Sequence, residues 1–228
     1  MTKQLFPLAL GGLAIGTTEF IIMGLLPDVS NSLNVSIPIA GHLISAYALG
    51  VVIGAPILVA LSAKFPPKYI LISLMILFTI FNAFSIIAPD YNTLLMSRFF
   101  AGLPHGAFFG VWSVVAAKLS KKGKEAQAIA SMFTGLTIAI LAMVPFVTFL
   151  GHHLHWRYAF GVVSLLGLLI VLIPIFLQYF LIVELFVITT LSQKFDFATK
   201  SIIYSKINLS LYFSINLSDF ILLDKPLA

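Results

Sequence analysis

Cysteine is absent from this chain, and charged side chains are scarce. The absence of cysteine excludes disulfides, thiolate metal ligands and cysteine nucleophiles. Charged residues make up 9% of the 228 residues, whereas a soluble domain carries roughly 25%. Hydrophobic residues reach 60%, and the mean hydropathy is +1.09. A soluble fold of this size has too much surface to hide so many apolar side chains, so the composition predicts a protein whose solvent is lipid.

The motifs of several enzyme classes are also missing. The sequence contains no phosphate-binding P-loop, no HExxH metal motif and no GxSxG nucleophile elbow. It therefore gives no support to an ATP-driven pump, and we predict no enzyme activity, no cofactor and no resident metal. His152, His153 and His155 are close in sequence, but no cysteine or neighbouring carboxylate completes a metal site. These histidines are more typical of a polar outer loop.

Long apolar runs dominate the sequence instead. A bilayer core of roughly 30 Å needs about 20 apolar residues per helix. Six such runs can be drawn: Phe6–Leu26, His42–Leu61, Tyr69–Ala88, Leu94–Ala117, Ala126–Leu150 and Tyr158–Phe180. Turn-forming residues separate them at Pro27-Asp28, Pro66-Pro67, Pro89-Asp90, 121–124 and 151–153. We therefore predict an all-α membrane protein in which residues 1–181 form a bundle of six transmembrane helices.

Basic residues between the runs predict the orientation of the chain. Lysines cluster in the N-terminal segment and in alternate connections, whereas the other connections contain only Arg157. The lysines of the first group are Lys3, Lys64, Lys68, Lys118, Lys121, Lys122 and Lys124. Because positive residues stay on the cytoplasmic side, we predict a multi-pass protein with a cytoplasmic N-terminus. The formal charge of +5 is then a topology signal, and we predict no nucleic-acid partner.

Residues 182–228 differ in character from the bundle. Residues 158–191 stay apolar over 34 positions, about 51 Å as one helix, so this run must break or leave the bilayer. Ile207–Leu217 alternates apolar and polar residues with the period of a strand, and an isolated strand cannot span lipid. Three interpretations of this tail stay open. It lies at the membrane surface or pairs with another segment, it is disordered, or it is out-of-frame sequence that ends a truncated chain.

One carboxylate falls within the first apolar run, where a charge costs a few kcal/mol to insert. Glu19 lies about 10 Å from the expected outer end of that run, on the same helix face as Gly12 and Gly16. Small residues mark close helix packing, so this face points to neighbouring helices or a cavity. A carboxyl group there can bind and release protons, which predicts a proton-coupling site. The alternative is a structural carboxylate held in one hydrogen bond.

The fourth run adds a cation and an imidazole. Arg98 lies at a depth close to that of Glu19, which permits a Glu19–Arg98 pair, direct or through water. His105 shares a face with Arg98 two turns deeper, and imidazole titrates in the physiological range. We predict a proton or substrate role for His105; alternatively, it bonds a carbonyl freed by Pro104. An intramembrane enzyme built on these three groups is a further alternative.

Small residues and prolines also recur in the apolar runs. Gly16, Gly102 and Gly106 belong to ladders at four-residue spacing, which permit close helix packing. Pro104 and Pro145 are candidates for helix kinks. Such features are common in multi-span proteins, so they predict packing and do not identify a function.

Three groups of motifs carry a resemblance to a known family. They are IGTTEFIIMGLLP at 15–27, RFFAGLPHGA at 98–107, and a set made of GLT at 135–137, VP at 144–145 and GHHLHWR at 151–157. These motifs resemble helix 1, helix 4, and helix 5 with its following loop in exporters of the major facilitator superfamily. The most similar branch is that of the arabinose-export and chloramphenicol-resistance-like drug:proton antiporters. The resemblance covers about residues 5–180.

This resemblance implies the N-terminal half of a twelve-helix transporter, in which substrate is held between two six-helix halves. It implies proton-coupled efflux of a small molecule, such as a drug or a sugar, across the inner cell membrane. The implied partners are the lipid bilayer, substrate and protons, together with a second six-helix half or a second copy of the chain. The alternative is a truncated, non-transporting fragment or a partner subunit that requires a second half.

Overall fold

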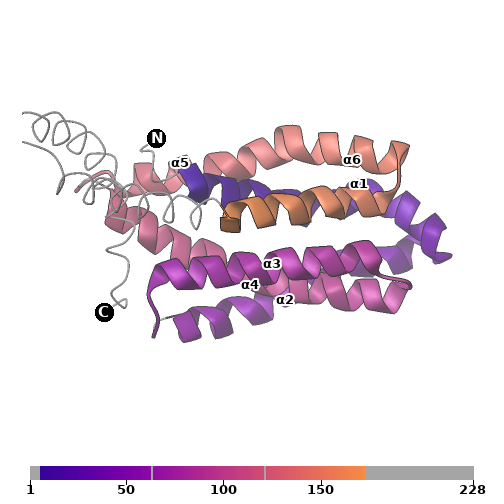
Figure 1. Ribbon diagram of the computed structural model, residues 1–228, viewed down its shortest axis with the longest axis horizontal. Helices are drawn as coiled ribbons and strands as arrows, with labels where there is room; N and C mark the ends of the chain where they lie inside the picture. Colours follow the sequence, from indigo (N-terminus) through magenta and orange to yellow (C-terminus); the bar gives the residue numbers. More distant parts are fainter. Residues whose placement is uncertain (1–5, 63, 121, 173–228) are drawn as a thin grey trace, which may run out of the picture.

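The computed structural model describes residues 6–62, 64–120 and 122–172. All regular structure in these ranges is helical, which confirms the all-α prediction. The predicted tail and the last part of the sixth predicted helix lie outside the described residues. The helices run side by side along the long axis of the molecule (Figure 1).

The described helices match the predicted runs in number and order. They are α1 (Phe6–Leu33), α2 (Ile37–Ser62), α3 (Pro67–Ile87), α4 (Tyr91–Leu119), α5 (Glu125–Ile138), the π-helical turn η2 (Ala139–Met143) and α6 (Val144–His153), followed by an unlabelled helix at Trp156–Leu172. The α5, η2 and α6 segments form one rod from Glu125 to His153. Five of the described helices are long and apolar enough to cross a membrane, and the described part of the Trp156–Leu172 helix is shorter.

Two of the predicted helix breaks coincide with helix starts. Pro67 occupies the first turn of α3, where its missing N–H costs nothing. Asp90 caps α4, because its side chain accepts a hydrogen bond from the backbone N–H of Thr93 at 2.8 Å. The predicted turn at 121–124 also lies between helices, and Gly123 adopts a φ of 84° there, a conformation that glycine accepts without strain.

The predicted break at Pro27-Asp28 is wrong, because α1 continues through Pro27 to Leu33. Leu25 and Val29, on either side of the proline, are both fully buried in the core, so packing holds the segment helical. The helix ends instead at Leu33, and the next residue, Asn34, has a φ of 52°. The N–H of Val35 then bonds the carbonyl of Ser30 at 3.1 Å, a Schellman ending with asparagine in the left-handed position.

The break predicted at residues 151–153 comes too early, because α6 continues to His153. Gly151 serves close packing here rather than a turn. A Cβ added at Gly151 would lie 2.6 Å from the Cδ2 atom of Leu25. The helix therefore needs a small residue at this point to approach α1.

Glycines also bring α2 and α4 into backbone contact. A Cβ at Gly54 would lie 2.2 Å from the carbonyl oxygen of Leu103, and one at Gly102 would lie 2.2 Å from that of Tyr47. Gly106 faces Ala55 in the same seam. Gly16 plays a similar part between α1 and the α5–η2 rod, where it faces Leu136 and Ala139. This close approach fixes the positions of polar groups on α1, α2 and α4 relative to one another.

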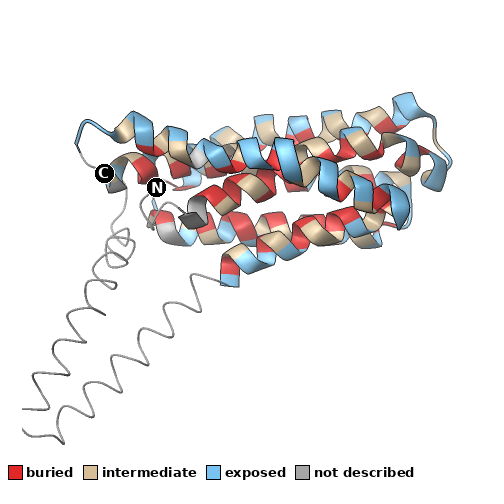
Figure 2. Cartoon of the chain, turned by 90° about the horizontal axis from the view of Figure 1, so that it is seen from above, coloured by how far each residue is buried: buried red, intermediate tan, exposed pale blue. Residues whose placement is uncertain are grey.

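Burial follows the pattern expected of a bundle in lipid. Figure 2 shows buried positions and exposed positions alternating around the same helices. Large aliphatic side chains remain exposed along the helices, among them Val52, Ile87 and Leu141. Exposed aliphatic side chains on helices of this length suit contact with acyl chains.

Candidate proton and substrate site

Glu19 and His105 lie at the middle of the bundle. Glu19 is the fourteenth of the 28 residues of α1, and His105 is the fifteenth of the 29 residues of α4. The expected position of Glu19 about 10 Å from the outer end is wrong, because α1 extends past Pro27. The carboxylate is instead roughly 20 Å from either end of its helix.

The structure brings the side chains of Glu19 on α1 and His105 on α4 close together. The Nε2 atom of His105 lies 4.0 Å from the Oε2 atom of Glu19. The Glu19 side chain is 34% exposed and the His105 side chain is 13% exposed. The carboxylate is therefore reachable from outside the bundle, while the imidazole lies behind it.

Arg98 is fully buried, and its hydrogen-bond partner differs from the one expected. Its Nη1 atom donates to the hydroxyl of Thr18 at 3.0 Å, and its Nη2 atom donates to the backbone carbonyl of Thr18 at 2.8 Å. Among the described residues no carboxylate pairs with Arg98 within 4.0 Å, so the direct Glu19–Arg98 pair is absent. Successive residues point about 100° apart on a helix, so the guanidinium reaches Thr18 while Glu19 turns toward His105.

The Thr18 contact extends into α3. The hydroxyl of Thr18 donates to the Oδ1 atom of Asn82 at 2.6 Å, and the Nδ2 atom of Asn82 donates to the carbonyl of Phe78 at 2.8 Å. Thr18 and Asn82 are both fully buried. Arg98, Thr18 and Asn82 thus form a polar network through α4, α1 and α3 in an otherwise apolar core.

Tyr47 on α2 connects this network to the Glu19–His105 pair. Its hydroxyl lies 2.9 Å from the Nδ1 atom of His105, and its ring centroid lies 4.4 Å from the Cζ atom of Arg98. The imidazole therefore bonds Tyr47, and the alternative of a bond to a carbonyl freed by Pro104 is not what the described residues show. Aromatic rings complete the surroundings, with Phe109 next to His105 and Phe160 next to Arg98.

The two predicted prolines lie within α4 and at the start of α6. Pro104 is buried within α4, directly before His105. Pro145 follows the π-helical turn, in which the N–H of Val144 bonds the carbonyl of Ala139. Ala139 is the residue that Gly16 contacts, so the irregular turn lies against α1 one turn before Glu19.

The three histidines at and just after the end of α6 do not come together in one site. His152 pairs with Asp28 on α1, with its Nδ1 atom 2.7 Å from Oδ2. His153 contacts the carbonyl of Phe149, and His155 accepts from the backbone N–H of Arg157. Within the described ranges no group of three or more metal-ligating side chains is found.

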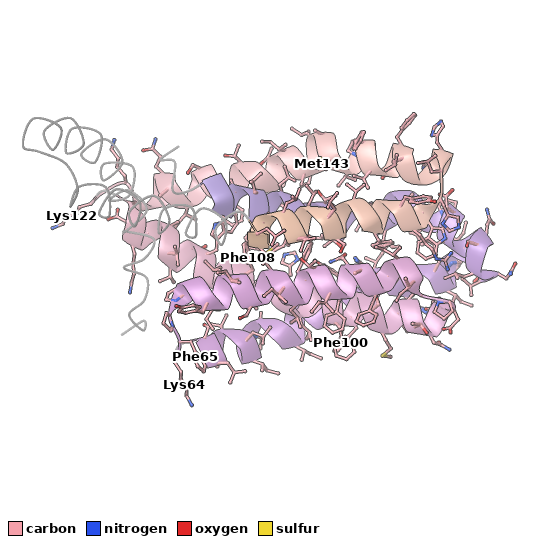
Figure 3. The ribbon with its side chains drawn as sticks, viewed as in Figure 1. Lys64, Phe65, Phe100, Phe108, Lys122 and Met143 are labelled. Atoms are coloured by element: carbon pink, nitrogen blue, oxygen red, sulfur yellow. The ribbon has the colours of Figure 1, made fainter. Side chains whose placement is uncertain are left out.

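Lys64 and Lys122 lie toward the same end of the molecule (Figure 3). Lys64 belongs to the α2–α3 connection and Lys122 to the α4–α5 connection. Phe100, which is also labelled, lies within α4 and not in a connection (Figure 3). The basic connections therefore share one side of the bundle, as their use as topology markers requires.

Comparison with known proteins covers most of the chain. The sequence profile of the Major Facilitator Superfamily matches residues 8–202. The inner membrane transport protein YdhP of Escherichia coli is 50% identical over 170 residues, which are 72% of this chain and 44% of that protein. The putative transporter AraJ of Escherichia coli is 42% identical over 168 residues, which are 74% of this chain and 43% of that protein.

A third relative is named for a resistance phenotype. The chloramphenicol resistance protein of Streptomyces lividans is 34% identical over 164 residues, which are 72% of this chain and 42% of that protein. In all three comparisons the matched region spans less than half of the curated relative.

Proposed function

Because this chain belongs to the major facilitator superfamily, we propose that it forms the proton-coupling half of a transporter that exports a small molecule across the inner cell membrane. In this proposal Glu19 binds and releases the coupling proton. A transporter rather than an enzyme is what the family supports. The observation that carries the proposal is the partly exposed Glu19 carboxylate at mid-bundle, 4.0 Å from His105.

The position of Glu19 supports proton exchange. Ionisable groups at membrane depth are costly and mark ion or proton pathways in transporters. A carboxylate that was purely structural would be enclosed by its partners, whereas the Glu19 side chain keeps a third of its surface open. Proton exchange with substrate or solvent needs such access.

The buried charge of Arg98 supports the same function. A buried guanidinium without a paired carboxylate lowers the stability of the fold. Thr18 accepts a hydrogen bond from Arg98, and Asn82 accepts one from Thr18. We infer that this positive charge is kept because the field it creates acts on the proton site. Rearrangement of Arg98 would then change how readily Glu19 holds its proton.

The substrate path requires a second bundle. Transporters of this family hold substrate between two six-helix halves near the bilayer midplane, and this chain spans 42–44% of the three relatives described above. We propose that a second copy of this chain supplies the other side. Chloramphenicol and a sugar are the first substrates to test, since relatives are named for chloramphenicol resistance and probable sugar efflux.

The test uses the full chain in proteoliposomes with an imposed pH gradient and radiolabelled chloramphenicol or arabinose. Gradient-dependent uptake is expected for the wild type, and Glu19→Gln should abolish it. Glu125→Gln is the matched control, because Glu125 lies at the start of α5, where it accepts from the N–H of Gly123, and glutamine keeps an acceptor there.

Two outcomes would overturn the proposal. If Glu19→Gln transports at the wild-type rate, then Glu19 is not the coupling site. If the wild type shows no gradient-dependent uptake of either compound, then the chain is the non-transporting fragment or partner subunit of the alternative interpretation.

A further inference from the structure

Tyr47 contacts both Arg98 and His105 of α4. The side chain comes from α2 and is only 3% exposed. Its hydroxyl reaches the Nδ1 atom of His105 at 2.9 Å, and its ring face lies against the guanidinium of Arg98 at 4.4 Å. Through these two contacts Tyr47 joins the proposed proton site to the buried cation.

The hydrogen bond between Tyr47 and His105 restricts where the imidazole carries its proton. A neutral imidazole has one N–H donor and one acceptor nitrogen, and a phenol donates one O–H. If the Tyr47 hydroxyl donates to Nδ1, the proton of the neutral ring must lie on Nε2. That nitrogen is the one facing the Oε2 atom of Glu19 at 4.0 Å.

We propose that Tyr47 is a positioning residue that holds neutral His105 in the Nε2–H tautomer, so that the imidazole presents an N–H to Glu19. This inference rests on the proposed function for its consequence in transport. The hydrogen bond made by one ring nitrogen generally sets which state the other adopts. When a second proton binds at Nδ1, the same hydroxyl oxygen accepts the new N–H, so Tyr47 serves both charge states of the ring.

The surroundings leave Tyr47 as the side chain that sets the tautomer. The charged or titratable groups described around the ring are Glu19 from α1, Tyr47 from α2 and Arg98 from α4 itself. Glu19 faces Nε2, and Arg98 contacts the tyrosine ring rather than the imidazole. Phe109 packs against the imidazole at 5.2 Å between ring centroids and offers no hydrogen-bonding group.

The direct test is the tautomer of His105 in the full chain in lipid bilayers. Solid-state NMR with ¹⁵N-labelled histidine distinguishes the two neutral tautomers, and comparison with His105→Gln assigns the signal. The wild type is expected to carry the proton on Nε2. Tyr47→Phe keeps the ring over Arg98 but removes the hydroxyl, and it should give a mixture of tautomers.

Tyr91→Phe is the matched control. The Tyr91 hydroxyl also links α4 to α2, by donating to the carbonyl of Ile39 at 2.9 Å, but it lies away from His105. This variant should keep the wild-type tautomer. The proposal is overturned if the wild-type ring carries its proton on Nδ1, a result that needs no variant to fold, or if Tyr47→Phe leaves the Nε2–H tautomer unchanged.

A transport measurement completes the test. Loss of one hydrogen bond at the proton site should slow gradient-driven uptake by Tyr47→Phe about 2- to 12-fold. An unchanged rate contradicts the positioning role. Normal transport by Glu19→Gln would instead overturn the proposed function, while the tautomer measurement would still decide the role of Tyr47.

Discussion

Arg98 gives a prediction in which protein stability and the proposed transport change in different directions. Its guanidinium is buried, donates two hydrogen bonds to Thr18 and has no described carboxylate partner. Replacing a buried ion pair by apolar groups of similar volume is often neutral or stabilising, and loss of Arg98 leaves no described carboxylate without its counter-charge. We therefore expect Arg98→Met to melt at or above the wild-type temperature in detergent while losing proton-driven transport.

Arg157→Met is the comparison for this prediction. Arg157 is partly buried and donates to the carbonyl of Ala88, the C-cap residue of α3, at 2.7 Å, so its loss should lower the melting temperature and spare transport. A fall of more than about 4 °C for Arg98→Met, or about 1 kcal/mol for a domain of this size, would show that Arg98 is a structural residue.

Asp90 gives a prediction with a defined pH window. The backbone N–H of Thr93 donates to its carboxylate and holds the pKa of Asp90 below the ordinary value of 3.8. A lowered folded-state pKa means that the carboxylate stabilises the fold above pH 3.8 and loses this effect as the pH falls through the lower, folded-state pKa. Asp90→Ala should therefore lower the melting temperature at pH 7, and its difference from wild type should narrow at pH 2.

Asp90→Asn serves as the control, since asparagine keeps a capping oxygen that does not titrate. Its difference from Asp90→Ala should be the same at both pH values. If the difference between Asp90→Ala and wild type is also constant, the Asp90 charge contributes nothing to the cap.

The candidate site could be predicted in part from single residues. Glu19, Arg98 and His105 stand out because charged and titratable groups are rare in apolar runs. Tyr47, Thr18 and Asn82 could not be singled out in this way, since uncharged polar residues are frequent in membrane helices and only the packing of α1, α2 and α3 against α4 shows what they bond. For the same reason the sequence does not indicate that Arg98 bonds Thr18 instead of pairing directly with Glu19.

At the scale of helices, the seam between α2 and α4 makes the clearest prediction. A Cβ at Gly54 would meet the backbone of Leu103 at 2.2 Å, whereas one at Gly41 on the same helix meets nothing within 4 Å. Gly54→Ala should lower the free energy of unfolding by about 1–3 kcal/mol, because the helices must separate. Gly41→Ala should be neutral or raise it by up to about 1 kcal/mol through helix propensity.

Thermal unfolding of both variants in the same detergent checks this prediction. Equal melting temperatures for Gly54→Ala and Gly41→Ala would mean that α2 and α4 do not approach as closely as the structure has them.

The helices themselves could be predicted from apolar run length, but their ends could not always be. Pro67 and Asp90 mark helix starts correctly because first-turn and capping preferences act locally. Pro27 does not end its helix, because burial of Leu25 and Val29 in the core overrides the local turn signal. Gly151 does not form a turn, because it allows the close approach of α6 to α1. Glu19 lies farther from the end of its helix than expected, as a direct consequence of the continuation of α1 past Pro27.

For the whole molecule, the absence of cysteine offers a clean background for mapping topology. We predict that Lys64→Cys and Lys122→Cys react with a membrane-impermeant maleimide only after the membrane is opened, because basic connections stay cytoplasmic. Asn34→Cys, in the α1–α2 connection at the opposite end, should react in intact cells. Labelling of Lys64→Cys and Asn34→Cys from the same side would contradict the bundle's orientation.

Proton movement driven by substrate is the decisive measurement for the proposed function. Proteoliposomes that contain the full chain and a trapped pH-sensitive dye would be exposed to chloramphenicol or arabinose without an imposed gradient. We predict a change in internal pH for the wild type and for Glu125→Gln, and none for Glu19→Gln. A response of Glu19→Gln equal to that of the wild type, or no response of the wild type to either compound, would contradict this prediction.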